Sequence, residues 1–334
     1  MSHFIRATLQ QIRRFVCSLS IASRVAAAIW FAYFMIGTMA FAEPRGIAAG
    51  STDATRVRIA PRREGEVTHV YVENSELGEV TMTFCFSAQN LKSSVAFPHT
   101  GTFAPGKTEG FMLTPIDSAQ PWEYAYTNYY KLGSSVAEHD DSVLYLLPYT
   151  DGKTFRVTQG YNGTYSHTGS NQYATDWKMP EGTPVRAARG GMVVKVRDNS
   201  RKGGASMKYD RYNNYIVIRH EDGTMAQYCH LQMGGAKVVP GQMVHAGDLI
   251  ALSGNTGFSS GAHLHFCVFK TKDGMECVSI PVKFKGEDGA PVTLFEGQAY
   301  KATAIRMATA AASRRLAAAS PAAQEAVPMT PSGG

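Results

Sequence analysis

Gly261-Ala-His-Leu-His-Phe-Cys-Val-Phe269 is the stretch that decides how this chain folds and what chemistry it offers. Two histidines, His263 and His265, alternate there with the apolar Leu264 and Phe266. Side chains at positions i and i+2 of a β-strand lie on the same face. We therefore expect both imidazoles to project from one face of a strand, while the apolar side chains pack behind it.

Two imidazoles on one face suit a metal site better than a hydrophobic core. A buried imidazole needs a polar partner, whereas neutral imidazole is a good zinc ligand. A second segment, Met225–Leu231, brings His230 to the end of another expected strand, and a third carries His167 followed nine positions later by Asp176. Each piece alone is weak evidence, because His-x-His pairs are also structural features and an isolated His-to-Asp spacing indicates almost nothing.

The chain around these segments predicts an all-β protein. Between residues 55 and 149, β-branched and aromatic residues alternate with polar ones, as in Val67–Val72, Val80–Phe86 and Val143–Leu147. We read residues 43–150 as an N-terminal accessory domain resembling a β-sandwich, which ends near Pro148–Asp151.

Residues 151–302 form the second expected domain. Short strands separated by frequent turns indicate an antiparallel β-sheet core with little helix. The strands are expected at 191–196, 215–220, 225–231, 249–253 and 263–269. The tail, residues 303–334, is rich in Ala and Pro and is expected to be disordered.

The N-terminus resembles an export signal. Several arginines precede the uncharged apolar run Val25–Ala42, which ends in Ala40-Phe41-Ala42. This order is typical of a cleavable secretory signal over residues 1–42, although eighteen apolar residues would also serve as an uncleaved anchor. Either alternative places the remaining chain outside the cytoplasm, in the periplasm or cell envelope, and membrane association is expected only if the segment stays uncleaved.

Charge and cysteine content restrict the partners further. A net charge of +6 suits a polyanion, but no basic stripe interleaved with aromatics occurs, so nucleic acid is not an expected partner. After loss of Cys17 with the signal, four cysteines would allow three pairings. Cys267 and Cys277 flank an expected turn, so a cross-strand bridge between them is geometrically reasonable, and small buried apolar residues are the alternative.

Taken together, residues 157–281 resemble the lysostaphin/LytM-type zinc endopeptidases. The resemblance lies in several motifs that occur in the family's order and spacing: Met179-Pro-Glu-Gly-Thr-Pro-Val185, Asn214-Tyr-Ile-Val-Ile-Arg-His220, Tyr228-Cys-His-Leu231, Val239-Pro-Gly-Gln-Met-Val244, Ser253-Gly-Asn-Thr-Gly257 and Gly261-Ala-His-Leu-His-Phe266. The matched stretch covers more than a third of the chain. The resemblance implies an antiparallel β-sheet core, one Zn²⁺ per chain and the cleavage of peptide bonds in peptidoglycan.

Carried over by residue, the resemblance gives His167, Asp176 and His265 as metal ligands and His230 and His263 as the two non-ligand histidines beside the metal. The spacing departs from the family's usual His-x-x-x-Asp motif, because eight residues separate His167 from Asp176. An insertion at Gly169-Ser-Asn-Gln172 would account for the difference.

Two histidines and one carboxylate would leave one position of a tetrahedral zinc open to water, as in catalytic sites. We expect His263 to help deprotonate that water and His230 to stabilise the oxyanion, or the two to exchange these roles. The loop from Asp198 to Asp210, with its arginines and lysines, is a candidate basic wall that attracts carboxylates. The main alternative is a non-catalytic relative, a wall-binding scaffold or an activator of another cell-wall hydrolase.

Overall fold

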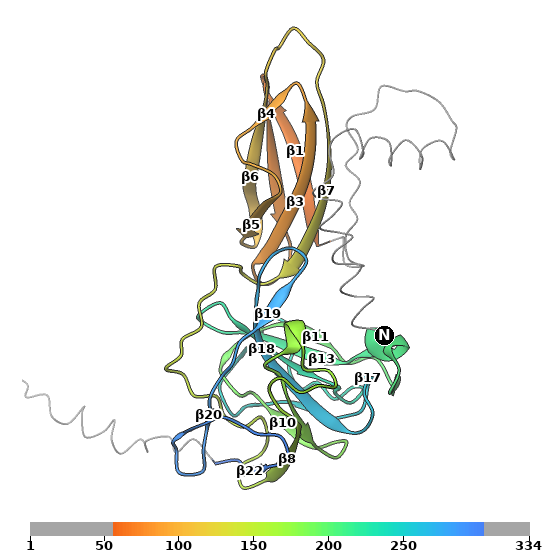
Figure 1. Cartoon of the computed structure of the whole chain (residues 1–334), viewed down its shortest axis with the longest axis vertical. Coiled ribbons are helices and arrows are strands. Elements are labelled where there is room, and N and C mark those ends of the chain that lie inside the picture. Colours follow the sequence, from red (N-terminus) through yellow and green to blue (C-terminus); the bar gives the residue numbers. More distant parts are fainter. Residues whose placement is uncertain (1–55, 304–334) are drawn as a thin grey trace, which may run out of the picture. The chain divides into compact units, whose positions relative to one another are not determined.

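The computed structural model describes residues 56–303 (Figure 1). Over this range the chain consists of β-strands and two short 3₁₀ turns, Gly169–Asn171 and Met207–Tyr212, which confirms the all-β prediction. The expected signal segment 1–42, Cys17 and the tail beyond residue 303 lie outside the described residues. Within 56–303, the structure contains no helix with the length and apolar character needed to cross a membrane.

The N-terminal part is a pair of antiparallel sheets (Figure 1). One sheet has the order β1 (Val57–Glu64), β2 (Val67–Asn74), β6 (Gly106–Pro115) and β4 (Leu91–Ser93), and the other has the order β5 (His99–Phe103), β3 (Val80–Gln89) and β7 (Glu123–Leu132). Every second residue of β2 is buried, as its alternating sequence predicts. Side chains from both sheets form one core, among them Val72, Phe84, Phe111 and Leu113. This arrangement is that of a β-sandwich.

The C-terminal part is built on a nine-stranded antiparallel sheet. Its order is β15 (Met243–Val244), β11 (Gly191–Arg197), β13 (Tyr215–Arg219), β14 (Met225–Cys229), β18 (His263–Thr271), β9 (Thr175–Lys178), β8 (Thr154–Gln159) and β22 (Ala299–Lys301), with β19 (Cys277–Ser279) paired to β18. Smaller ladders join β10 (Pro184–Arg186) to β16 (Leu249–Leu252), β12 (Gly203–Gly204) to β17 (Gly257–Phe258), and β20 (Phe284–Lys285) to β21 (Pro291–Val292).

Strand β18 lies in the middle of this sheet, and its side chains alternate between the two faces of the sheet. Leu264, Phe266 and Val268 are at most 2% exposed and belong to the main core. On the neighbouring strand β9, Trp177 is fully buried in the same core. His263 and His265 alternate with these residues and therefore project from the opposite face, as the sequence predicted.

The prediction of a strand at Val143–Leu147 is wrong. This stretch is extended, but Tyr145 forms only an isolated bridge with Phe284. Its main chain bonds to two separate segments, because Tyr145 N donates to Lys283 O and Leu146 N donates to Ala188 O. The alternating side chains are explained by the core, in which Tyr145 and Leu147 are buried. The division of the chain into domains at residue 150 stays a prediction.

The proposed bridge between Cys267 and Cys277 is also wrong, since both thiols are free. The strand register gives the reason: Cys277 on β19 pairs with Thr271, four residues along β18 from Cys267. Four residues of strand span about 13 Å, beyond the reach of a disulfide. Cys229 is free as well, and burial raises the pKa of its thiol to about 12. Cys229 and Cys267 are buried, the alternative that the sequence also allowed, and Cys277 is partly buried.

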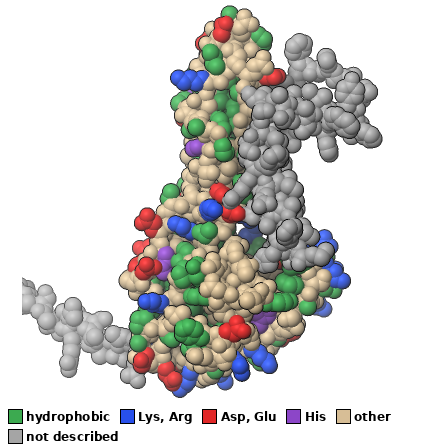
Figure 2. Space-filling model, in the orientation of Figure 1, with side chains coloured by type: hydrophobic (Ala, Val, Ile, Leu, Met, Phe, Trp, Pro, Cys, Tyr) green, Lys and Arg blue, Asp and Glu red, His purple; other side chains and the backbone are tan. Residues whose placement is uncertain are grey.

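The β18–β19 hairpin contacts the sandwich. Thr271 Oγ1 donates to the carbonyl of Leu132 at 2.7 Å, and Gly274 N donates to Thr83 Oγ1 at 2.9 Å. A partly exposed ion pair at 3.4 Å joins Arg219 to Glu79. On the face shown in Figure 2, acidic and basic side chains are interspersed rather than gathered by sign.

Candidate metal centre

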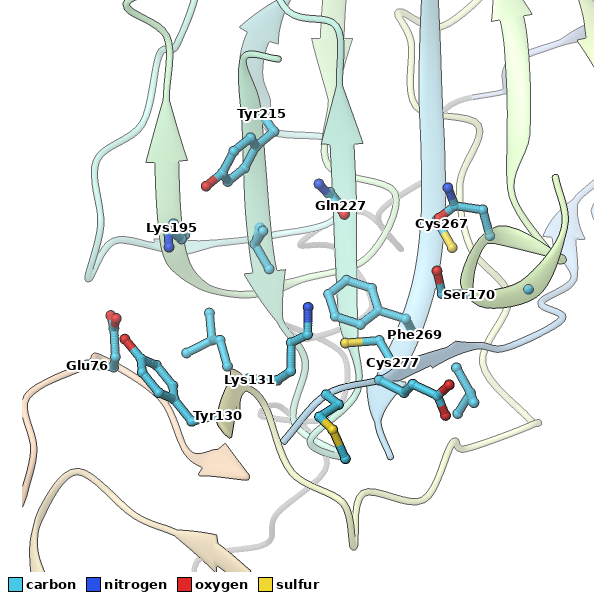
Figure 3. Close-up of a pocket in the computed structure, with 17 residues that line it drawn as sticks. Glu76, Tyr130, Lys131, Ser170, Lys195, Tyr215, Gln227, Cys267, Phe269 and Cys277 are labelled. Carbon is cyan, nitrogen blue, oxygen red and sulfur yellow. The ribbon is translucent and has the colours of Figure 1, made fainter. Parts of the chain in front are cut away.

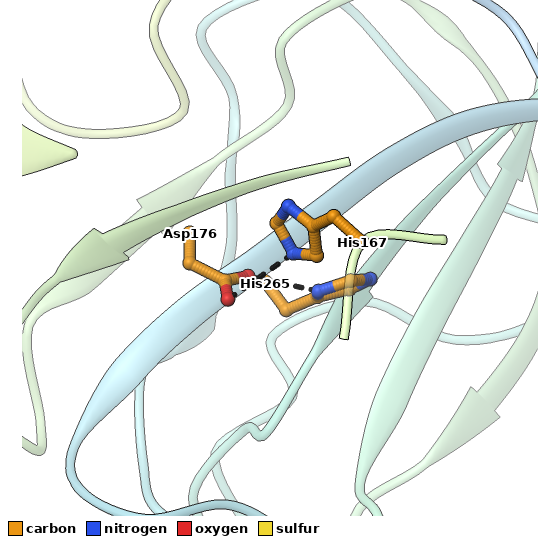
Figure 4. Close-up of side chains that lie close together, drawn as sticks. All are labelled: His167, Asp176 and His265. Carbon is orange, nitrogen blue, oxygen red and sulfur yellow. Dashed lines mark hydrogen bonds and ion pairs between the residues drawn. The ribbon is translucent and has the colours of Figure 1, made fainter. Parts of the chain in front are cut away.

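Three side chains from separate segments meet at one end of the large sheet (Figure 4). Asp176 on β9 and His265 on β18 are direct cross-strand neighbours, and Asp176 Oδ1 lies 2.8 Å from His265 Nδ1. His167 comes from the loop between β8 and β9, and its Nε2 lies 3.2 Å from Asp176 Oδ2. One ligand atom from each residue lies within 4.8 Å of the other two, a spacing that a single metal ion can bridge.

A hydrogen bond to the main chain orients the imidazole of His167. The ring is fully buried, and Nδ1 donates to the carbonyl of Gly160 at 2.8 Å. A neutral imidazole that donates from Nδ1 carries its lone pair on Nε2. That nitrogen is buried, lies 3.2 Å from Asp176 Oδ2 and has no hydrogen-bond partner. An unpartnered buried nitrogen aimed at a carboxylate fits a metal ligand.

Asp176 is ionised in this setting. Burial opposes the charged form, but the neighbouring His265 holds the pKa of this carboxyl well below its ordinary value. A buried carboxylate with two imidazoles provides one oxygen and two nitrogen donors, the donor set of many catalytic zinc sites. The residues therefore fit a divalent metal.

The long spacing between His167 and Asp176 is accommodated in the loop. Gly169–Asn171 forms a 3₁₀ turn with no fully buried residue. The chain then returns to β9 through Ala174, which is buried. The 3₁₀ turn falls in the stretch 169–172, where the insertion was expected.

His230 follows β14 and lies beside the three ligand candidates. Its ring centroid is 4.5 Å from that of His263 and 5.9 Å from that of His265. The backbone has φ +63°, which is uncommon outside glycine and is found at functional sites more often than elsewhere. Nδ1 donates to the carbonyl of Thr256 at 2.7 Å. Burial, followed by the neighbouring His263, lowers the pKa of His230 to about 3.

His263 is held in a similar way but is less buried. Its Nδ1 lies 2.8 Å from the carbonyl of Gly261 and 3.1 Å from Ser259 Oγ. Its Nε2 lies 3.9 Å from Asp176 Oδ2. In the neutral tautomer that donates from Nδ1, Nε2 is a proton acceptor, and the same holds for His230.

A cleft of about 370 Å³ opens beside the site and is lined by Asp176, His230, His263 and His265, but not by the fully buried His167. Tyr165 and Phe258 face each other in it, with ring centroids 6.0 Å apart. Lys178, two residues after Asp176 and paired across the sheet with His263, contributes the cationic side chain of the lining. The sequence analysis did not single out Lys178, although its spacing from Asp176 places both on one face of β9. The arginines and lysines of the loop 198–210 do not line the cleft.

Gln159 is a further cleft residue that the sequence analysis missed. A β-bulge lies between Val157, which pairs with Trp177, and Gln159, which pairs with Asp176. Without the bulge the side chains at 157 and 159 would share a face. With it, Val157 faces the core and Gln159 faces the carboxylate, and simple alternation does not predict this change.

A larger cavity of about 690 Å³ continues the same face of β18 (Figure 3). Cys267 and Phe269 line it from β18, Ser170 from the 3₁₀ turn, and Tyr130 and Lys131 from the sandwich. Among residues 56–303, only His167, Asp176 and His265 form a group suited to hold a metal, and two of its members, Asp176 and His265, line the smaller cleft.

Part of this chain is similar to known proteins. Residues 170–277 match the model of peptidase family M23, a range that includes Asp176 and His265 and begins just after His167. The peptidoglycan DD-endopeptidase ShyA of Vibrio cholerae is 35% identical over 116 residues, which cover 34% of this chain and 24% of the relative. The glycyl-glycine endopeptidase ALE-1 of Staphylococcus capitis is 39% identical over 99 residues, 29% of this chain and 24% of the relative.

Among solved structures, the catalytic domain of lysostaphin from Staphylococcus simulans is 28% identical, with a TM-score of 0.26, and the alignment covers 40% of this chain and 87% of that one. This chain spans about a quarter of the length of the two curated relatives.

Proposed function

We propose, on the premise that residues 170–277 of this chain belong to peptidase family M23, that the chain is a zinc-dependent endopeptidase acting on peptide bonds in peptidoglycan cross-links or stem peptides. The observation that carries the proposal is the meeting of His167, Asp176 and His265, with a buried imidazole nitrogen that lacks a hydrogen-bond partner. Relatives named as peptidoglycan and glycyl-glycine endopeptidases support the substrate class.

The three residues would hold one zinc ion through His167 Nε2, the Asp176 carboxylate and a ring nitrogen of His265. When bound, zinc polarises a scissile carbonyl and makes water acidic enough to lose a proton near neutral pH. The chain's own contribution is to present these ligands already oriented, because the Gly160 carbonyl fixes the tautomer of His167 and the sheet register fixes Asp176 against His265.

Of the two remaining histidines, we assign proton transfer to His263. Its Nδ1–H is anchored on the Gly261 carbonyl, so Nε2 can take the proton that the attacking water releases. His230 presents Nε2 in the same way, but a pKa of about 3 makes its imidazole a weak base. His230 would act on the reacting carbonyl oxygen only while protonated, so we assign it to orienting water and substrate.

Lys178 extends the substrate preference. Its side chain lines the cleft. A cation near the reaction centre favours a peptide that carries a carboxylate close to the scissile bond. Such carboxylates occur in the stem peptides of cell walls, and the proposal places the enzyme's action in the cell envelope.

The test is to incubate the purified full chain, loaded with zinc, with peptidoglycan and to separate the released fragments by chromatography and mass spectrometry. We expect cross-linked dimers to be converted to monomers, and chelator to stop the conversion. The His265→Ala variant is expected to release no fragments and to retain less than one zinc per chain.

Intact cross-links in the presence of one bound zinc per chain would favour the alternative, a wall-binding scaffold or activator. A pull-down with insoluble peptidoglycan distinguishes that role from a different peptide substrate. Normal cleavage by His265→Ala would refute the ligand assignment.

A further inference from the structure

Gln159 is the last residue of β8 and lies directly behind the proposed metal centre. The bulge in β8 places it opposite Asp176, and the residue is 7% exposed. A buried primary amide has two donor hydrogens and an acceptor oxygen that all require partners. The partners of this amide are therefore informative.

Every polar group of the Gln159 side chain is used, and the contacts join two of the three ligand segments. Oε1 accepts hydrogen bonds from the backbone N–H groups of Tyr165 at 3.2 Å and Ser166 at 3.1 Å. Nε2 donates to Ser166 Oγ at 2.7 Å and to Asp176 Oδ2 at 3.2 Å. Tyr165 and Ser166 immediately precede His167 in the chain.

We propose that Gln159 is a positioning residue that sets His167 against Asp176 and thereby raises the affinity of the centre for zinc. The inference rests on the proposed metal centre and deepens it. The amide closes the loop 160–166 onto β8 and ties its end to the Asp176 carboxylate. The two ligands are separated by eight residues, so local chain geometry alone does not fix their distance, and Gln159 supplies that constraint.

The contact with Asp176 also determines which carboxylate oxygen faces which neighbouring side chain. Oδ1 faces His265 Nδ1 at 2.8 Å, while Oδ2 receives the Gln159 amide and lies 3.2 Å from His167 Nε2. A donor behind Oδ2 holds the carboxylate plane so that both oxygens keep these directions. Hydrogen-bonded partners of metal ligands change metal affinity by roughly 10- to 100-fold when removed.

The chemistry of position 159 requires an amide rather than an acid. A glutamate there has nearly the same shape but loses both N–H donors. It would place a second carboxylate beside Asp176, where like charges repel. Gln159→Glu therefore removes the hydrogen bond to Asp176 and adds a negative charge without leaving a cavity. Gln159→Ala also removes the contacts with the loop.

The experiment measures zinc affinity of the full chain by competition with a chromophoric chelator, for the wild type, Gln159→Ala and Gln159→Glu. Gln172→Ala is the matched control, because Gln172 is another amide that holds the loop 160–166, but it donates to Asn162 Oδ1 at 2.8 Å rather than to one of the three ligands. We expect the dissociation constant to rise about 10- to 100-fold in both Gln159 variants and less than threefold in Gln172→Ala.

Two further measurements separate positioning from general stability. The unfolding midpoint of each zinc-free protein reports folding, and the visible spectrum of the cobalt-substituted protein reports the geometry around the ion. A shifted cobalt spectrum in Gln159→Glu with a zinc-free midpoint like the control's supports the proposal. Unchanged zinc affinity and an unchanged cobalt spectrum in both Gln159 variants overturn it, whereas a wild type that binds no zinc overturns the proposed function itself.

Discussion

The four histidines around the candidate centre divide by what their ring nitrogens contact. His167 and His265 approach Asp176 within hydrogen-bond distance, whereas His263 approaches it only to 3.9 Å and His230 contacts the other imidazoles. Ligands and non-ligands should therefore respond differently to substitution. Substitution of a ligand should abolish metal binding, whereas substitution of a non-ligand should lower only the rate of peptide cleavage.

We expect His263→Ala and His230→Asn to retain one zinc per chain and to lose about 10²- to 10⁴-fold in the rate of peptide cleavage. Asparagine is the suitable replacement at 230, because it tolerates the positive φ of that position better than alanine does. Metal content is measured by mass spectrometry and rate by fragment release. Zinc loss in His263→Ala equal to that in His265→Ala would place His263 among the ligands.

His220 shows an error of interpretation at the same scale. His220 lies at the end of an apolar strand, a place where alternation alone favours a solvent-facing side chain, but the residue is 1% exposed. Its Nδ1 donates to the carbonyl of Gly190, and burial lowers its pKa to about 4. Arg189 and Asp222, which form an ion pair at 2.7 Å, lie beside it.

The lowered pKa of His220 predicts a loss of stability in acid. The unfolded chain binds the proton near pH 6.5, whereas the folded chain binds it only near pH 4. The contribution is thus fully present above pH 6.5 and disappears as the pH falls to 4, a change of about 3 kcal/mol. In His220→Asn, which keeps an N–H donor for Gly190, the free energy of unfolding should depend less on pH over this window.

Urea denaturation at pH 7.0, 5.5 and 4.5 measures this effect, and the difference between wild type and His220→Asn is the relevant quantity. Other titrating groups are common to both proteins and cancel in the difference. A constant difference across the three pH values would show that His220 is protonated as readily in the folded chain as in the unfolded one.

Among the elements, strand β18 is the easiest to predict from sequence, because one of its faces carries histidines and the other carries apolar side chains. Leu264 is fully buried between the histidines, so Leu264→Ala should lower the free energy of unfolding by about 2–5 kcal/mol. The zinc-loaded protein should keep its metal, since both ligand strands remain paired. Leu77→Ala, at a position 39% exposed, is the control and should change stability by less than about 0.5 kcal/mol.

Leu264→Ala is measured by chemical denaturation of the zinc-free protein together with metal content of the loaded one. Equal stability of the Leu264 and Leu77 variants would contradict the packing of β18. The same strand shows why His263 and His265 were predictable: a regular strand needs only alternation to place its side chains.

Strand β8 shows the limit of that reasoning. Its bulge reverses the face of Gln159, and the sequence Thr-Phe-Arg-Val-Thr-Gln159 contains no glycine or proline to mark the irregularity. The meeting of His167 with Asp176 was likewise available only from the family resemblance, because a loop of eight residues has no periodicity. Regular elements were predictable from residues, and the loop and bulge that complete the site were not.

In the whole molecule, the alternation of apolar and polar residues predicted which side chains are buried better than it predicted which segments pair as strands. Val143–Leu147 alternates because Tyr145 and Leu147 enter the core, yet its main chain finds two separate partners instead of one strand. The register that separates Cys267 from Cys277 depends on where the β18–β19 hairpin turns, and a turn prediction one or two residues in error changes every pair. Contacts between distant segments thus required the structure.

The contact between the sandwich and the β18–β19 hairpin gives a prediction at this largest scale. A Cβ atom at Gly274 would lie 2.2 Å from the carbonyl oxygen of Tyr129 and 2.6 Å from Thr83 N. Both are backbone atoms and cannot rotate away. Gly274→Ala must therefore move the hairpin away from β3 and β7 and should cost about 1–3 kcal/mol of unfolding free energy.

Gly78→Ala is the matched control, because Gly78 lies at the same junction but its added Cβ would meet Val194, Leu132 and Arg219 side chains at 3.6–3.7 Å, an ordinary contact. Alanine there should be neutral or slightly stabilising, since it reduces the freedom of the unfolded chain. Urea denaturation compares the two, and limited proteolysis reports whether the hairpin opens. If Gly274→Ala matched Gly78→Ala in both measurements, the hydrogen bond from Gly274 to Thr83 would not hold the hairpin against the sandwich in solution, and the two cores would have to be stable without it.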